Sequence, residues 1–138
     1  MSDIQAVTAR TTREAGRYVL EGPGKVFLSD SALIRQKPSV APNPIEFLVS
    51  ALASCAIASV ESDARDLDVA VRGAGAEVTA TRDEADESRF RSILVAITVE
   101  GVDQGTAERL TAHFIGHCPV YNTIRRGGPI EVAVRAVP

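Results

Sequence analysis

The feature that most constrains the fold is an uncharged stretch of 14 residues that runs from Phe47 to Val60. Asn43 and Pro44 stand shortly before it, and these residue types favour the N-cap and the first position of a helix. The stretch is apolar nearly all round, which is typical of a helix that is buried on most sides. It contains three serines and is shorter than the roughly 18 apolar residues that a membrane span needs. We therefore predict a long buried helix over residues 43–65 and no membrane segment.

Alternating apolar residues on both sides of this helix predict strands. Ile93, Val95 and Ile97 recur at period two, whereas Leu110 and Phe114 lie four apart, as on one face of a helix. Besides the long helix, the predicted elements are strands at 4–10, 17–21, 25–30, 66–82, 92–101 and 129–137 and helices at 103–116 and 118–126. The order β-β-β-α-β-β-α-α-β predicts a single α+β domain over residues 1–138 with mostly antiparallel pairing.

Composition excludes some functions and favours assembly with a second copy of the chain. The net charge is −3 and the sequence pI is about 5.4, so we expect no nucleic-acid surface. No signal peptide is evident, and the protein is expected in the cytoplasm, where thiols stay reduced. Aromatic residues make up 4% and Trp is absent, so Val, Ile, Leu and Ala must build the core. We expect a core of such small side chains to need a second subunit in order to bury enough apolar area.

Two cysteines, Cys55 and Cys118, carry the chemistry of this sequence. Cys118 precedes Pro119 at a predicted helix start, where backbone N–H groups and the helix dipole stabilise a thiolate. A buried apolar role for Cys118 is an equal alternative at this point. Cys55 lies in the middle of the long helix among alanines, which by itself favours core packing. Four roles for the two cysteines remain open at this point: inert core packing, a structural disulfide, metal ligands or a reactive pair.

A metal site is one of these alternatives. His113 and His117 are four residues apart and Cys118 is adjacent, and a His-xxx-His pair on one helical face can chelate zinc. We expect Gly116 to break the helix between the two histidines, which spoils the shared face. The sequence also offers no acidic residue close by. We therefore predict no metal ligands and no cofactor.

Two motifs together resemble the family of osmotically induced and organic hydroperoxide resistance proteins, called OsmC/Ohr. They are NPIEFLVSALASC at 43–55 and HCPVYNT at 117–123. The resemblance implies the OsmC-like α+β fold, an antiparallel sheet with a long buried central helix, in an intertwined homodimer. It implies a thiol peroxidase that uses neither metal nor haem. Cys55 would attack an organic hydroperoxide, Cys118 would resolve the product as a disulfide, and an external dithiol would reduce it.

The same resemblance assigns a cation and a carboxylate to the site. An Arg in the first hairpin turn would keep the peroxidatic Cys ionised, and Arg13 takes that position, with Arg17 and Arg35 as alternatives. In the hydroperoxide resistance branch a Glu directly follows the Asn-Pro proline, whereas here Glu46 comes one residue later. Nine residues at about 100° each place Glu46 on the opposite side of the helix from Cys55. The displaced Glu resembles the OsmC-like branch. The alternative function is a domain without peroxidase activity that binds a small apolar ligand at the dimer interface.

Overall fold

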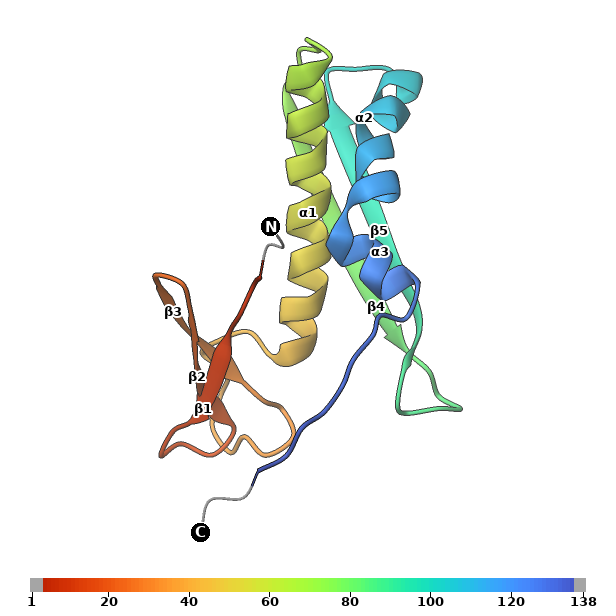
Figure 1. The fold of residues 1–138 in the computed structure, drawn as a ribbon. Helices are drawn as coiled ribbons and strands as arrows, with labels where there is room; N and C mark the ends of the chain where they lie inside the picture. The colour runs from red at the N-terminus through yellow and green to blue at the C-terminus, as the bar shows by residue number, and fades with distance from the viewer. Residues whose placement is uncertain (1–3, 136–138) are drawn as a thin grey trace. The chain divides into compact units, whose positions relative to one another are not determined.

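The computed structural model describes residues 4–135. The chain forms two compact units, one up to Val49 and one from Ser50 onward. Within the described residues the elements are β1 (Thr8–Thr11), β2 (Arg17–Gly22), β3 (Lys25–Asp30), α1 (Pro44–Asp66), β4 (Gly73–Arg82), β5 (Phe90–Glu100), α2 (Gln104–His117) and α3 (Pro119–Arg125) (Figure 1). This mixture of helices and antiparallel sheets confirms the predicted α+β class.

The first unit is a three-stranded antiparallel sheet in the order β1-β2-β3. Gly16 ends the turn between β1 and β2 with a φ of 80°. A Cβ atom at this position would lie 2.9 Å from the backbone nitrogen of Arg35. Glycine is therefore required at position 16 by both the backbone conformation and the close approach. This turn carries Arg13.

A buried ion pair lies at one end of this sheet. Arg17 donates through Nε to Oδ1 of Asp30 at 2.8 Å and through a terminal nitrogen to Oδ2 at 3.2 Å. The backbone N–H groups of Val40 and Ala41 also donate to Oδ2, at 2.7 and 3.2 Å. The side chain of Asp30 is 0% exposed. The Arg17 hydrogen bond, followed by the Val40 bond, lowers the pKa of Asp30 to about 2.

Replacing Asp30 by Asn should destabilise the protein in a pH-dependent way. The folded-state pKa of Asp30 is depressed, so its stabilisation is present above the unfolded pKa of about 4 and is lost as the pH falls toward 2. Urea unfolding of both proteins at pH values from 7 to 2 measures this. The difference in free energy of unfolding should be large at pH 7 and shrink below pH 4. Glu21→Gln, on an exposed pair with Arg10, is the control and should have little effect. A difference that does not change with pH would contradict the prediction.

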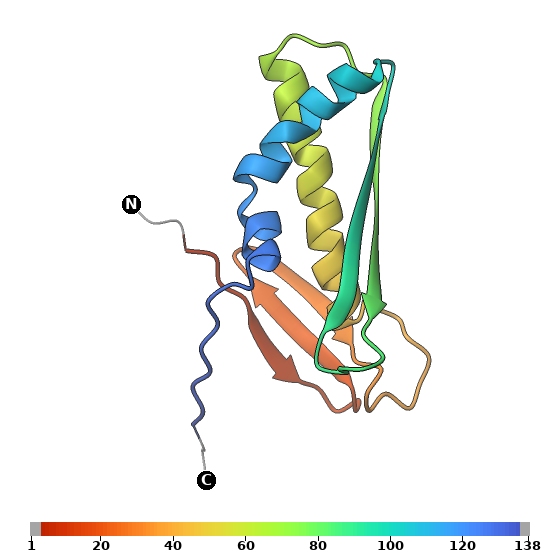
Figure 2. The ribbon, with the colours of Figure 1, turned by 90° about the vertical axis from the view of Figure 1, so that its right-hand side faces the viewer.

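In the second unit, α1 and α2 lie on one face of the β4–β5 hairpin (Figure 2). The buried residues of α1 recur every four positions, at Leu52, Ala56, Val60 and Ala64. This stripe follows from the 3.6-residue period of the helix. Leu110 and Phe114 of α2 complete the core, and inward residues of β5 such as Val95 and Ile97 pack against it.

Several predicted boundaries differ from the structure. The strand β1 begins at Thr8 rather than at residue 4, and β4 begins at Gly73 rather than at residue 66, because α1 continues to Asp66. We predicted that α2 ends at Gly116, but the helix continues through Gly116 to His117. We also predicted a strand over 129–137, and residues 129–135 form none, while residues 136 and 137 lie outside the described part. The alternating Ile130, Val132 and Val134 are 84–91% exposed. A strand requires a hydrogen-bonding neighbour, and residues 4–135 offer this segment none.

The long helix is also less buried than predicted. By length and composition α1 is able to cross a membrane, although core helices of soluble proteins have the same properties. Only 17% of its most apolar 18-residue window is buried within the structure. The stripe from Leu52 to Ala64 is covered, whereas Ala51, Ser54 and Ala58 are exposed. Within residues 4–135, one apolar side of α1 is therefore uncovered.

Candidate active site

Cys55 lies in the middle of α1, next to the buried stripe. Its side chain is partly exposed and packs against the core cluster that contains Ala56, Phe114 and Cys118. The helical period places Cys55 between the buried and the uncovered sides of α1. The thiol thus faces the core without being sealed inside it.

Cys118 lies at the junction of α2 and α3. It ends α2 and is the N-cap of α3, with Pro119 in the first turn, as the sequence predicts. The backbone N–H of Tyr121 donates to Sγ of Cys118 at 3.4 Å. The residue is only 5% exposed. The sulfur is therefore held in place by its own turn and directed into the second unit.

Asn122 holds this junction together. Its side-chain nitrogen Nδ2 donates to the carbonyl oxygen of Ile115 at 3.2 Å and to that of Cys118 at 3.0 Å. These bonds tie the last turn of α2 to the first turn of α3. Sequence reasoning assigned Asn122 no role, although it is part of the motif that contains Cys118. The sequence signal that could have identified it is an asparagine four residues after the predicted N-cap, Cys118.

Replacing Asn122 by Ala should loosen the turn that carries Cys118. Two hydrogen bonds are lost, so we expect a decrease in the free energy of unfolding of about 1–3 kcal/mol. We also expect faster alkylation of Cys118 by iodoacetamide under native conditions. Gln104→Ala is a matched control, because the Gln104 amide bonds only the exposed Glu108 side chain on the surface of α2. Equal effects of the two substitutions would contradict a specific role for Asn122.

The two cysteines share one open cavity of about 240 Å³. Its lining residues are Cys55, Ala58, Ser59, Ser62, His113, His117, Cys118 and Pro119. Both cysteines are free thiols in the structure. Burial raises the pKa of the Cys55 thiol, and a side-chain hydrogen bond and the charge of Cys118 raise it further. The fold thus brings together two thiols that are far apart in the sequence.

Two histidines form the wall of this cavity opposite the α1 residues. Because α2 continues through Gly116, His113 and His117 share one helical face, and the reason we gave against a shared face is wrong. Their rings stack with centroids 4.6 Å apart. Nδ1 of His113 lies 3.9 Å from Oδ1 of Asp63 on α1. Even so, residues 4–135 contain no group of three or more His, Cys, Asp or Glu side chains arranged to hold a metal ion.

The charged candidates from the sequence have different surroundings. Arg17 is committed to Asp30. Within residues 4–135 the side chains of Arg13, which is exposed, and Arg35, which is half-buried, have no ion-pair partner. Glu46 forms a capping box, in which its carboxylate accepts from the N–H of Asn43 at 2.7 Å and its own N–H donates to the Asn43 side chain at 3.0 Å. This arrangement stabilises the start of α1.

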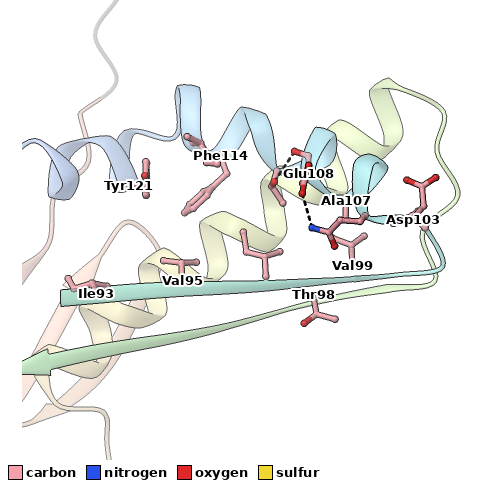
Figure 3. A pocket seen from close by; sticks show the side chains of 14 residues that line it. Ile93, Val95, Thr98, Val99, Asp103, Ala107, Glu108, Phe114 and Tyr121 are labelled. Carbon is pink, nitrogen blue, oxygen red and sulfur yellow. Dashed lines mark hydrogen bonds between the residues drawn. The ribbon is translucent and has the colours of Figure 1, made fainter.

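A second, larger cavity of about 640 Å³ lies between β5 and α2 (Figure 3). Its apolar lining comes from β5 residues such as Val95 and Val99 and from Phe114 of α2. Asp103 and Glu108 belong to its polar rim. No cysteine lines this cavity. Its volume is in the range of small-molecule sites, but it is open to solvent.

Comparisons with known proteins agree with this architecture. A family model described as OsmC-like protein matches residues 36–133. An OsmC-like protein from Mycoplasma pneumoniae aligns with a TM-score of 0.75 and 17% identity, over 91% of this chain and 89% of that chain. None of the curated protein sequences matches this chain.

Two further solved structures have names that refer to organic hydroperoxides. The organic hydroperoxide resistance protein OsmC from Legionella pneumophila aligns with a TM-score of 0.65 and 21% identity, over 89% of this chain and 90% of that chain. The organic hydroperoxide resistance protein OhrB of Bacillus subtilis aligns with a TM-score of 0.60 and 20% identity, over 91% of this chain and 92% of that chain. At these identities the likeness establishes the fold.

Proposed function

The chain belongs to the OsmC-like protein family, and from that premise we propose that it is a thiol-dependent peroxidase for organic hydroperoxides. The observation that carries the proposal is the meeting of two free thiols, Cys55 and Cys118, in one solvent-accessible cavity. Two neighbouring free thiols, one of them partly exposed at a cavity that opens to solvent, are the arrangement of a reactive pair rather than of core filler. The names of the relatives from Legionella pneumophila and Bacillus subtilis support the same reaction.

The proposed reaction has three steps. The Cys55 thiolate attacks one oxygen of the hydroperoxide, the O–O bond breaks, and the products are Cys55 sulfenic acid and an alcohol. Cys118 then attacks the sulfenic sulfur, the S–O bond breaks, and a disulfide and water form. An external dithiol finally reduces the disulfide and restores both thiols. No metal or cofactor takes part in the proposed cycle.

The proposed first step needs a cation near Cys55. The thiolate is the nucleophile, and the raised pKa of Cys55 keeps the thiol protonated at neutral pH in the single chain. Arg13 is the proposed source of positive charge, because its guanidinium has no ion-pair partner within residues 4–135. Arg35 is the next candidate. Arg17 is less suitable because Asp30 already binds it, and Glu46 supports the helix start that precedes Cys55.

Replacing Arg13 by Ala should slow the first step at neutral pH. Losing a nearby cation raises a thiol pKa by about 1–3 units, so the thiolate fraction falls at least about tenfold. The deficit should disappear at high pH, where the thiol ionises without help. Stopped-flow measurement of hydroperoxide consumption from pH 6 to 10 tests this. Arg10→Ala, at an exposed position of β1, is the control. Unchanged kinetics in the Arg13 variant would transfer the role to Arg35 or Arg17.

The proposal as a whole is tested with the wild-type protein, cumene hydroperoxide and a dithiol. We expect turnover well above that of free cysteine and slower reaction with hydrogen peroxide, because the apolar helix favours an apolar substrate. Oxidised protein should contain an intramolecular disulfide between Cys55 and Cys118 and lack two free thiols. A rate no faster than that of free cysteine would contradict the peroxidase function.

We propose that the working form is a cytoplasmic homodimer. The uncovered side of α1, the open cavity between β5 and α2, and the exposed Ile130, Val132 and Val134 leave apolar surface that a second copy of the chain would cover. The proposal includes neither nucleic acid nor a membrane as partner.

The larger cavity favours one alternative function. A domain without peroxidase activity would bind a small apolar ligand in this cavity, where side chains of β5 and α2 form an apolar floor. In that case wild-type protein would not exceed free cysteine in hydroperoxide assays. Val95→Asp, which places a charge on the cavity floor, would then abolish binding of a medium-chain alcohol in calorimetry, whereas Cys55→Ser would leave binding unchanged.

A further inference from the structure

The thiol cavity contains two histidines for which the proposed reaction has no use. His113 and His117 line it together with both cysteines, and their rings stack with centroids 4.6 Å apart and an interplanar angle of 24°. Asp63, whose side chain is 16% exposed, lies 3.9 Å from Nδ1 of His113. The two imidazoles therefore line one cavity with both thiols, and a carboxylate of α1 lies beside the first imidazole.

The resolving step of the proposed cycle needs a group that moves a proton. Cys118 must lose its thiol proton as it attacks the sulfenic sulfur of Cys55, and hydroxide must gain a proton as it leaves. The apolar neighbours of Cys55 cannot supply either transfer, and Ser59 and Ser62 are poor bases. Histidine is the side chain that most often performs this task in enzymes.

We propose that His117 is the acid–base residue of the thiol cavity. It accepts the proton of Cys118 as the S–S bond forms, and it returns that proton to the hydroxide as the S–O bond of Cys55 sulfenic acid breaks. Water and a disulfide are the products, so the histidine ends the step as it began. The inference rests on the proposed function for its sulfenic acid, but it holds for any reaction in which Cys118 attacks a sulfur on Cys55.

His113 is assigned a positioning role. Its Nδ1 lies 3.9 Å from Oδ1 of Asp63, within ion-pair range when the imidazole is protonated, and its ring stacks on the ring of His117. We assign the proton transfer to His117 rather than to His113 because His117 directly precedes Cys118 in the chain. The titratable groups that line the cavity with His117 are Cys55 of α1, His113 of α2 and Cys118, and Asp63 lies beside His113.

A thiol exchange assay tests this role without any hydroperoxide. When 5,5′-dithiobis(2-nitrobenzoate) reacts with Cys55, Cys118 attacks the mixed disulfide, releases the second thionitrobenzoate and gives its proton to His117. In His117→Gln we expect this second release to slow about 10- to 100-fold, at the low end of general base effects. The rate that remains should rise toward high pH, where hydroxide replaces the histidine as the base. Arg109→Gln, at an exposed position on α2, is the matched control and should behave as wild type.

Chemical rescue separates proton transfer from damage to the fold. In His117→Ala, free imidazole in the buffer should restore the rate of the second release, which no merely structural role predicts. A rate for His117→Gln within twofold of wild type would overturn the inference, as would the absence of imidazole rescue. With cumene hydroperoxide, His117→Gln should consume the first equivalent normally and accumulate sulfenic acid that dimedone traps. Failure of wild type in that second assay would contradict the peroxidase function, whereas the exchange assay decides the role of His117 by itself.

Discussion

Cys55→Ser is expected to abolish hydroperoxide turnover. A hydroxyl is far less ionised and less nucleophilic than a thiol, and removing an enzyme nucleophile eliminates the covalent route entirely. We expect a loss on the order of 10³-fold or more in kcat/KM for cumene hydroperoxide. Stopped-flow assays with excess dithiol measure it. Since Cys55 is only partly buried, serine should be accommodated without unfolding, which circular dichroism can check.

Cys118→Ser distinguishes the roles of the two thiols. This variant should consume one equivalent of hydroperoxide and then stop at Cys55 sulfenic acid, which lacks a resolving partner and is prone to further oxidation. Mass spectrometry after dimedone treatment should find the adduct on Cys55. Full multiple turnover in Cys118→Ser, or one-equivalent consumption in Cys55→Ser, would contradict the assignment of the attacking and resolving cysteines.

The second large effect concerns subunit assembly. Wild-type protein should have a mass of twice 14.6 kDa by light scattering and should dissociate only as it unfolds. For such a dimer each tenfold dilution lowers the apparent free energy of unfolding by about 1.4 kcal/mol. Ala51→Glu should disrupt assembly, because it places a charge on the uncovered side of α1. A folded wild-type monomer near 14.6 kDa would contradict the proposed dimer.

Ala112→Glu is the matched control for this experiment. Ala112 is an exposed alanine on α2, so the same substitution has the same intrinsic helix preference there. We expect Ala112→Glu to keep the mass and the concentration dependence of wild type. Ultracentrifugation of the two variants at equal chain concentrations makes the comparison direct. Loss of the dimer in both variants would indicate a general effect of charge rather than an interface on α1.

Local pattern was enough to predict most of the fold. The apolar run after Asn43 and Pro44 predicted α1, and alternation at period two predicted β5, because both signals depend on neighbouring residues. The strand at 129–137 was predicted from the same alternation and is not formed in its described part. A strand also depends on a partner, which local pattern cannot supply. Gly116 was expected to end α2, but a glycine ends a helix only when its backbone leaves the helical region.

The sequence predicted the two thiols of the candidate site but not the contacts of the histidines beside them. The two cysteine motifs, together with the family resemblance, pointed to a pair, and the structure brings Cys55 and Cys118 into one cavity. The stacking of His113 on His117 depended on where α2 ends, which the sequence pattern placed one residue too early. The contact of His113 with Asp63 joins residues 50 positions apart by tertiary packing, and no local signal reports it.

The uncovered side of α1 has a consequence for the newly made chain. A polypeptide leaving the ribosome with a 23-residue, largely apolar helix that it cannot cover alone is a substrate for chaperones and for unwanted insertion into lipid. If the working form is the homodimer proposed above, the lifetime of the uncovered form is set by how soon it meets another copy, which depends on the rate of synthesis. Cells that make little of this protein would therefore lose proportionally more of it to degradation than cells that make it in bursts.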